Sequence, residues 1–90
     1  MTDTTAAVRF YWRPGCGFCS ALAYELDRIG LEYEPLNIWE DPDAAGFVRS
    51  VAGGNETVPT IAVGAKALVN PAPSQVLAAV AAEAPHLLPS

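Results

Sequence analysis

Cys16-Gly17-Phe18-Cys19 contains both cysteines of this 90-residue chain and directly follows Arg13-Pro14-Gly15. No third cysteine is available to pair with either of them. Thiols in the cytoplasm are kept reduced, so a close cysteine pair in a cytoplasmic protein is more often catalytic or metal-binding than a structural crosslink. A C-x-x-C between a strand and a helix is typical of a dithiol–disulfide redox site. We therefore take this pair as the feature around which the fold is built.

The composition predicts one small domain over residues 1–90, with a flexible N-terminus at 1–6 and a C-terminal tail at 85–90. Apolar residues make up 51% of the chain, which is enough for a packed core. Ten acidic residues against five basic ones give a net charge of −5, and the basic residues form no cluster. A nucleic-acid partner is therefore not expected, because phosphate binding requires a basic surface.

The chain shows no sign of export or membrane insertion. Residues 1–7 are polar and uncharged apart from Asp3, so they lack the basic and apolar regions of a signal peptide. No apolar run approaches the roughly 18 residues that a membrane-spanning helix needs. We expect a soluble, cytoplasmic monomer with no membrane partner.

Hydrophobic periodicity and turn residues predict the order β-α-β-α-β-β-α. The expected strands are 8–12, 33–38, 57–63 and 66–69, and the expected helices are 17–29, 42–52 and 75–83. Gly30 ends the first helix, Asp41-Pro42 begins the second, and Gly64-Ala65 joins the last two strands in a hairpin. A βαβ crossover pairs its strands in parallel and a hairpin pairs them antiparallel, so the expected fold is α/β with a four-stranded mixed sheet flanked by helices.

This order places Cys16 at the carboxyl end of a strand and the amino end of a helix. The free N–H groups of a first helical turn and the helix dipole favour a thiolate there, and Gly17 leaves those amides open. Cys19 comes one turn later, where Cβ atoms at i and i+3 are about 5–6 Å apart and can be bridged. We expect Cys16 to be the exposed, attacking thiol and Cys19 to be the shielded, resolving one.

Two other interpretations of the cysteine pair compete with a redox site. Two core cysteines can meet at this spacing by chance, without any function. Half of a zinc site is the other interpretation, but tetrahedral zinc takes four ligands. The remaining soft donor is His86, far along the chain, so zinc would have to be shared between subunits. No metal site is expected, and the position between a strand and a helix favours redox chemistry.

The second notable motif is Thr57-Val58-Pro59. X–Pro bonds in folded proteins are cis in only about 5–6% of cases, so the residues alone favour a trans bond. Together with Cys16-Gly17-Phe18-Cys19, however, this motif resembles the thioredoxin superfamily and, within it, the glutaredoxins, over Val8 to Glu83. The resemblance implies a thioredoxin-like fold in which Pro59 is cis and faces the dithiol. It also implies that Val58 offers its backbone N–H and C=O to an extended substrate.

The finer resemblance is to the mycoredoxins. It lies in residues 53–60, Gly-Gly-Asn-Glu-Thr-Val-Pro-Thr, and in Asn70-Pro71 before the last helix. Glutaredoxins that use glutathione typically carry Gly-Gly and an Asp after the hairpin, which bind the charged glutamyl end. This chain has neither the glycine pair nor the aspartate after its hairpin. Mycothiol carries an uncharged pseudodisaccharide, so hydrogen bonds and aromatic faces should recognise it, and Tyr11, Trp12, Phe18 and Asn70 are the candidates.

Each of these candidates also has a purely structural interpretation. Trp12 fits equally well in the core, and Phe18 fits as a hydrophobic lid. Arg13, three residues before Cys16, can stabilise a thiolate or a substrate carboxylate, or can be an ordinary solvated residue. The expected catalytic residues are Cys16 and Cys19, which also form the redox-active disulfide. The expected substrate contacts are Arg13, Phe18, Thr57, Val58, Pro59 and Asn70.

The resemblance implies a thiol–disulfide oxidoreductase that removes a low-molecular-weight thiol from target proteins. The reducing co-substrate would be mycothiol, or glutathione, and no cofactor would be tightly bound. An alternative is a redoxin-type electron donor reduced by thioredoxin reductase. An iron–sulfur cluster carrier is an alternative from another class, because Cys-Gly-Phe-Cys differs from the Cys-Gly-Phe-Ser of cluster-carrying glutaredoxins only at Cys19. A non-catalytic interaction domain is the least attractive, because it leaves the paired thiols unexplained.

Overall fold

A computed structural model describes residues 7–89 and contains the four strands and three main helices expected from the sequence. The elements are β1 (Arg9–Trp12), α1 (Gly17–Ile29), β2 (Glu34–Asn37), α2 (Pro42–Val51), β3 (Thr60–Val63), β4 (Lys66–Val69), α3 (Pro73–Glu83) and the 3₁₀ helix η2 (Pro85–Leu87). The expectation of a flexible segment at 1–6 lies outside the described residues. No helix between residues 7 and 89 is both long and apolar enough to cross a membrane.

The strands form one mixed sheet in the order β2-β1-β3-β4. β1 pairs with β2 in parallel, with Phe10 opposite Pro35. It pairs with β3 antiparallel, with Phe10 opposite Ile61, and β3 and β4 form an antiparallel hairpin. The expected α/β fold with a mixed sheet is confirmed. β1 is an inner strand, so the loop that follows its carboxyl end lies between the ends of the neighbouring strands and not at an outer edge of the sheet.

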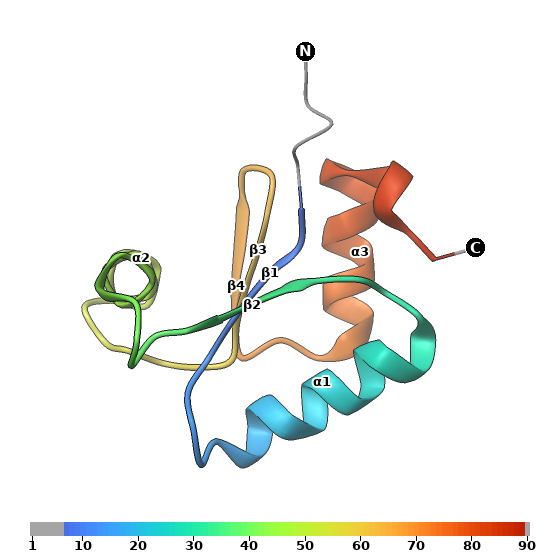
Figure 1. Cartoon of the computed structure of the whole chain (residues 1–90). Coiled ribbons are helices and arrows are strands. Elements are labelled where there is room, and N and C mark those ends of the chain that lie inside the picture. The colour runs from blue at the N-terminus through green and yellow to red at the C-terminus, as the bar shows by residue number, and fades with distance from the viewer. Residues whose placement is uncertain (1–6, 90) are drawn as a thin grey trace.

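Helices cover both faces of the sheet, α1 and α3 on one side and α2 on the other (Figure 1). Successive side chains of a strand point to opposite faces, and so β1 contributes to two cores. Phe10 and Ile61 are buried in the core that α1 and α3 cover. Tyr11 and Ala62 are buried in the core under α2. The sheet is therefore apolar on both faces, and packing on both sides fixes β1, the strand that leads into the cysteine motif.

Strand β3 begins at Thr60, three residues later than the sequence predicts. The segment before it leaves the sheet because Pro59 has no N–H to donate and the Thr60 hydroxyl instead donates to the Thr57 carbonyl oxygen at 2.8 Å. The Pro59 carbonyl still accepts a hydrogen bond from the Asn70 N–H at 2.7 Å. The prediction of a strand from Thr57 is therefore wrong at its start, and residues 57–59 form a loop beside the cysteines.

The helix boundaries follow from their capping residues. The Asp41 side chain accepts hydrogen bonds from the N–H groups of Asp43 and Ala44 at 3.0 and 3.2 Å, so α2 begins at Pro42 as expected. Gly30 ends α1 in the left-handed conformation, with φ 90°. After α3 the chain forms η2, and Leu87 packs against the main core.

Candidate active site

Cys16 is the N-cap residue of α1. Its backbone is extended, with φ −91° and ψ 104°, and its Sγ accepts a hydrogen bond from the Cys19 N–H at 3.1 Å. Its carbonyl oxygen accepts the first helical hydrogen bond, from the Ser20 N–H at 3.1 Å. The sulfur thus occupies the position in which a capping side chain satisfies a free amide of the first turn. A negative charge on this sulfur is favoured there by the same N–H and by the helix dipole.

A disulfide bond joins Cys16 to Cys19, whose Cα atoms are 5.2 Å apart. Cys16 is 8% exposed and Cys19 is 4% exposed. The expectation that Cys16 is exposed is therefore wrong for the oxidised pair. Its sulfur is bonded to the buried Cys19 and also lies against the loop that carries Val58, so little of its surface reaches solvent. The expected difference in accessibility between the two cysteines is small in this state.

The Val58 loop forms a wall beside the disulfide. The Val58–Pro59 peptide bond is cis, as the family resemblance implies. The Val58 carbonyl oxygen lies 3.8 Å from Cys16 Sγ. Within residues 7–89 the Val58 N–H donates no hydrogen bond, and Val58 is only partly buried. Its backbone therefore presents one donor and one acceptor next to the sulfur, with a geometry suited to an added strand.

Thr57 is the first residue of this loop, and Asn70 is hydrogen-bonded to the loop at the Pro59 carbonyl. Asn70 follows β4 with a φ of +51°, and its N–H is held by the Pro59 carbonyl. Its side chain is exposed. Thr57 is exposed as well, while its carbonyl is engaged by Thr60. The backbone of Asn70 therefore fixes the position of Pro59, whereas its side chain is available to a ligand.

Arg13 leaves β1 and turns toward the β2–α2 connection. Its guanidinium lies over the ring of Trp39, 5.8 Å from the ring centroid, and Nη1 donates to the Pro14 carbonyl at 3.1 Å. Trp39 is 63% exposed and was not expected at the site. The same turn, Asn37 to Asp41, also contains the buried core residue Ile38, so nothing in the sequence marked Trp39 as a site residue. Arg13 is thus placed by a cation–π contact beside the cysteines.

Tyr11 is not part of the site. It is 3% exposed and stacks on Phe47 of α2, with ring centroids 4.9 Å apart. Burial raises the pKa of its hydroxyl, and the nearby Arg9 charge partly opposes that shift. The expectation that Tyr11 offers an aromatic face to a substrate is wrong, because the side-chain alternation of β1 directs it to the α2 face of the sheet.

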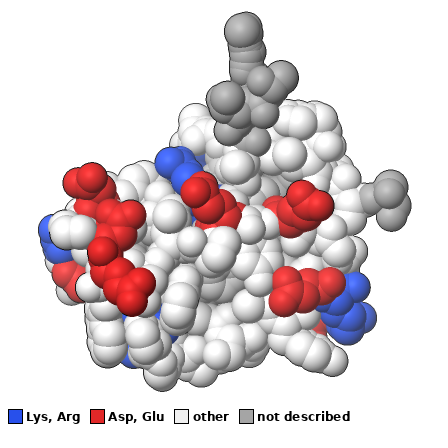
Figure 2. Space-filling view, in the orientation of Figure 1, with Lys and Arg blue, Asp and Glu red and all other residues white. Residues whose placement is uncertain are grey.

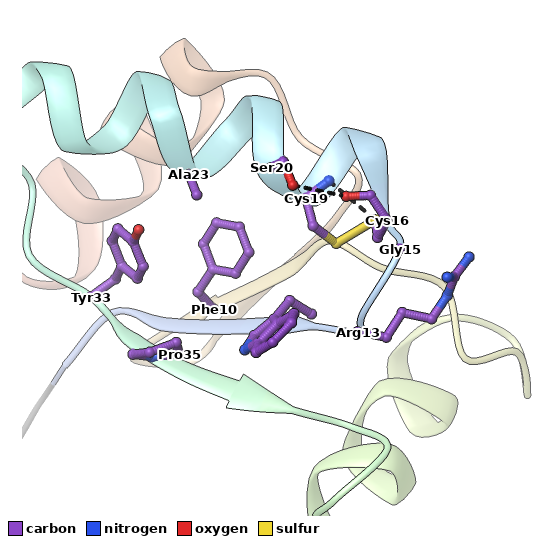
Figure 3. A pocket seen from close by; sticks show the side chains of 10 residues that line it. Phe10, Arg13, Gly15, Cys16, Cys19, Ser20, Ala23, Tyr33 and Pro35 are labelled. Atoms are coloured by element: carbon purple, nitrogen blue, oxygen red, sulfur yellow. Dashed lines mark hydrogen bonds between the residues drawn. A yellow bond between two sulfur atoms is a disulfide. The ribbon is translucent and has the colours of Figure 1, made fainter.

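A cavity of about 190 Å³ opens at the disulfide, between α1 and strands β1 and β2 (Figure 3). We call it the disulfide cavity. Its lining includes both cysteines, Trp12, Arg13, and Tyr33, which the sequence did not single out. Tyr33 donates a hydrogen bond from its hydroxyl to Asp27 Oδ1 at 2.9 Å. Burial raises the pKa of Tyr33, and the hydrogen bond to the Asp27 carboxylate raises it further.

A second cavity, also of about 190 Å³, lies on the other side of α1. We call it the Asn70 cavity; it is lined by Phe18, Ala21, Leu22, Glu25, Asn70, Pro71 and Pro73. Phe18 is 72% exposed here. Helix α1 therefore separates the predicted contacts into two groups, with Arg13 at one cavity and Phe18 and Asn70 at the other.

The described residues offer no arrangement of three or more His, Cys, Asp or Glu side chains that could hold a metal ion. A thioredoxin-like sheet with a dithiol at a helix N-terminus, facing a cis-proline loop, defines a thiol–disulfide oxidoreductase.

Comparison with known proteins identifies the family. The glutaredoxin family model matches residues 8–68, and the chain belongs to the glutaredoxin family. A protein of Mycobacterium tuberculosis whose name assigns it to the glutaredoxins is 39% identical over 75 residues, which cover 82% of this chain and 89% of that one. Mycoredoxin 1 of Corynebacterium glutamicum is 37% identical over 54 residues, which cover 60% of this chain and 66% of that one. The chain is thus a glutaredoxin-like protein near the mycoredoxins.

The solved structures agree with this assignment. The glutaredoxin-like NrdH-redoxin of Escherichia coli superposes with a TM-score of 0.66 at 25% identity, over 77% of this chain and 88% of that one. The family and the cysteine pair together identify this protein as a thiol–disulfide oxidoreductase.

Proposed function

We propose that this protein reduces mixed disulfides between proteins and mycothiol. Cys16 acts as the nucleophile and Cys19 as the resolving thiol. The observation that carries the proposal is the position of Cys16 Sγ, which accepts the Cys19 N–H at 3.1 Å and lies 3.8 Å from the Val58 carbonyl. One sulfur is thus supported as an anion beside a backbone edge that can hold a substrate.

The reaction consists of two thiol–disulfide exchanges. The Cys16 thiolate attacks the mycothiol sulfur of the mixed disulfide, a Cys16–mycothiol disulfide forms, and the target leaves as a thiolate that takes up a proton. The thiolate of a second mycothiol then attacks the bound mycothiol sulfur, which yields mycothiol disulfide and restores Cys16. Alternatively, the Cys19 thiolate attacks Cys16 Sγ, closes the Cys16–Cys19 disulfide and releases mycothiol.

The surrounding residues position the substrate in this proposal. The Val58 N–H and C=O pair with its extended backbone, and Pro59 holds that loop against the sulfurs. Arg13, held over Trp39, supplies the positive charge nearest in sequence to Cys16. The remaining contacts come from Phe18, Thr57 and Asn70.

Two features favour mycothiol over glutathione. The first is the similarity to a mycoredoxin. The second is the charge around the site: α3 begins after Ala72, with no acidic residue in its first turn to bind a glutamyl ammonium group. On the face shown in Figure 2, several carboxylates adjoin one another over α2 and others lie singly, while the basic side chains stand apart from one another. An anionic tripeptide gains little electrostatic attraction from such a surface. An uncharged pseudodisaccharide is neither attracted nor repelled by its charges.

The test compares one neutral target peptide carrying either mycothiol or glutathione in a mixed disulfide. We expect kcat/KM for the mycothiol form to exceed that for the glutathione form by at least tenfold, each assayed with its own thiol as reductant. Equal rates, or a preference for glutathione, would overturn the assignment of mycothiol and leave the oxidoreductase class intact.

A second candidate function is that of an electron donor reduced by thioredoxin reductase. The likeness to NrdH-redoxin favours it, because that protein is described as having a thioredoxin-like activity profile. Rapid oxidation of NADPH with thioredoxin reductase and a protein disulfide, in the absence of mycothiol, would support this candidate.

A further inference from the structure

Trp39 is 63% exposed, although tryptophan side chains are highly buried on average. Its neighbour Ile38 is 4% exposed and fills the core under α2, so the turn between β2 and α2 is anchored without the indole. Trp39 also lies outside the linings of the disulfide cavity and the Asn70 cavity. Tryptophan is enriched at the centres of protein–protein interfaces, and this side chain is placed to meet a protein surface.

The turn holds this indole in place before any partner binds. The Asn37 side chain accepts a hydrogen bond from the Trp39 N–H at 2.9 Å, and the Asn37 carbonyl accepts one from the Glu40 N–H at 3.1 Å. The Arg13 guanidinium lies 5.8 Å from the ring centroid and donates to the Pro14 carbonyl. A side chain that is ordered in advance loses little conformational entropy on binding.

The same turn is attached to the segment that leads to Cys16. The Ile38 N–H donates to the Trp12 carbonyl at 2.9 Å, and Trp12 is the residue before Arg13. Arg13 lines the disulfide cavity together with Cys16. A polypeptide whose sulfur approaches Cys16 can therefore extend past Arg13 onto Trp39.

The charge around Trp39 indicates which kind of polypeptide fits there. Glu40 and Asp43 are exposed, and neither forms an ion pair within residues 7–89. Several carboxylates adjoin one another over α2 (Figure 2), and the whole chain carries a net charge of −5. Lys and Arg side chains of a partner are attracted to such a surface, whereas carboxylates are repelled by it.

We infer that Trp39, Glu40 and Asp43 form a docking surface for a basic segment of the target polypeptide. We call it the Trp39 surface. An apolar side chain near the target cysteine packs on the indole, and Lys or Arg residues beside it face the two carboxylates. The Val58 backbone edge and the Asn70 cavity remain free for the low-molecular-weight half of the mixed disulfide. The inference goes beyond the proposed function, because it does not depend on which thiol that half is.

Two other aromatic side chains are equally exposed but less suitable. Tyr24 of α1 is 66% exposed, and the neighbouring carboxylate, Glu25, is already engaged by Arg28 at 2.6 Å. Phe18 is 72% exposed and lines the Asn70 cavity, next to the space for the low-molecular-weight half. Trp39 combines its exposure with carboxylates that are free to pair.

The test uses short peptides that each carry one cysteine in a mixed disulfide with 2-mercaptoethanol, which offers no recognition group. One peptide has a leucine and two lysines beside the cysteine, the second has glutamates for lysines, and the third has alanine for leucine. The reduced protein reacts in single turnovers. Cys16 attacks the mixed disulfide, Cys19 closes the Cys16–Cys19 disulfide, and both halves leave as thiols. Each rate is divided by the rate of the same peptide with dithiothreitol.

We expect the lysine peptide to react about tenfold faster than the glutamate peptide. Glu40→Gln combined with Asp43→Asn should lower this ratio at least threefold. Glu32→Gln combined with Glu34→Gln removes the same charge from exposed positions at the opposite end of β2 and should leave the ratio unchanged. An equal fall in both double variants would overturn the inference, because overall charge and not the Trp39 surface would then select the target. A preference for the glutamate peptide would overturn it as well.

Trp39→Ala tests the apolar part of the surface. We expect it to slow the leucine–lysine peptide about fivefold and the alanine–lysine peptide clearly less, whereas displacement of Arg13 alone would slow both equally. Tyr24→Ala removes an equally exposed aromatic ring and should slow neither. Equal losses for the two peptides in Trp39→Ala would show that no side chain packs on the indole.

Binding without catalysis gives a readout that needs no change at the Trp39 surface. The chain has two tryptophans, Trp12 and Trp39, and hence two indole N–H signals in NMR. The Cys16→Ser protein is titrated with the leucine–lysine peptide in which serine replaces cysteine. We expect the Trp39 signal and the Glu40 and Asp43 amides to shift while the Trp12 signal stays in place. No shift of Trp39 at millimolar peptide would overturn the inference, and failure of the mycothiol assignment would leave this result unaffected.

Discussion

At the scale of single residues, Cys16 and Cys19 differ in the backbone hydrogen bond that each sulfur receives. Cys16 Sγ accepts an N–H of the first helical turn, whereas Cys19 supplies that N–H and is the more buried of the two. A negative charge is therefore better supported at Cys16. We predict that Cys16→Ser lowers turnover of the mycothiol mixed disulfide at least 100-fold, because no nucleophile remains in that position.

Cys19→Ser should retain a substantial part of that turnover, because a second mycothiol can still release Cys16. Steady-state rates of the two variants under identical conditions check both expectations. Full activity in Cys16→Ser would contradict the assigned nucleophile, and complete inactivity in Cys19→Ser would show that the route through the intramolecular disulfide is obligatory.

Tyr33 gives a pH-dependent prediction. Burial first, and then the hydrogen bond to Asp27, raise the pKa of its hydroxyl above the ordinary value of 10.0. A proton held more tightly in the folded than in the unfolded state stabilises the fold below the unfolded pKa, and this stabilisation is lost as the pH rises through the folded pKa. The free energy of unfolding should therefore fall above about pH 10. Urea unfolding at pH 8 to 10.5 should show a shallower decline for Tyr33→Phe, whereas identical slopes would contradict the prediction.

At the scale of elements, the β3–β4 turn packs against the C-terminal end of α3. Gly64 has a φ of +56°, and a Cβ there would lie 2.5 Å from Glu83 Oε1 and 2.9 Å from Glu83 Cβ. The Glu83 carboxylate also accepts the Ala65 N–H at 2.9 Å. The hairpin turn therefore rests on the last residue of the helix, and no side chain fits between them.

Gly64→Ala should destabilise the fold more than Gly53→Ala. Gly53 has a similar φ of +66°, but a Cβ there would meet nothing within 4 Å. The control therefore carries only the backbone cost, about 1 kcal/mol. Gly64→Ala should add a further ~1–3 kcal/mol of steric strain. Urea unfolding followed by far-UV circular dichroism measures both, and equal losses in the two variants would show that Glu83 moves aside freely.

The elements also show how much of this structure the sequence can predict. Local signals placed α1 and α2 well, because Gly30 and Asp41-Pro42 act on their own neighbours. The start of β3 was misplaced, because leaving the sheet at Pro59 depends on the turn bond between Thr57 and Thr60. Periodicity identified all four strands, though not all of their ends, and could not tell that both faces of β1 are covered.

The site was predictable only where it is contiguous in sequence. The cysteine motif and the Thr57-Val58-Pro59 motif could be read directly, and the family resemblance supplied the cis bond. Tyr33 and Trp39 could not be anticipated, because they reach the site only through the pairing of β2 with β1 and the turn that follows β2. Strand order is a property of the assembled sheet, and no local pattern in this chain specifies it.

At the scale of the whole molecule, net charge should influence the choice of thiol. The protein carries a net charge of −5 on a body of 32 × 30 × 20 Å. At 0.01 M salt the screening length is about 30 Å, so the whole charge acts on an approaching ligand, whereas at 0.15 M it is about 8 Å. Glutathione is anionic and should be repelled at low salt, while the uncharged headgroup of mycothiol should not be.

We therefore predict that raising the salt from 0.01 to 0.15 M increases kcat/KM for a neutral peptide carrying glutathione about twofold. The kcat/KM for the same peptide carrying mycothiol should change little, because that substrate carries no net charge for the protein to repel. 2-Hydroxyethyl disulfide serves as an uncharged control for effects of salt on the cysteines themselves. A parallel rise for all three substrates would show that salt acts on the reactivity of Cys16. A fall for the glutathione form alone would mean that Arg13 attracts the tripeptide more strongly than the overall charge repels it.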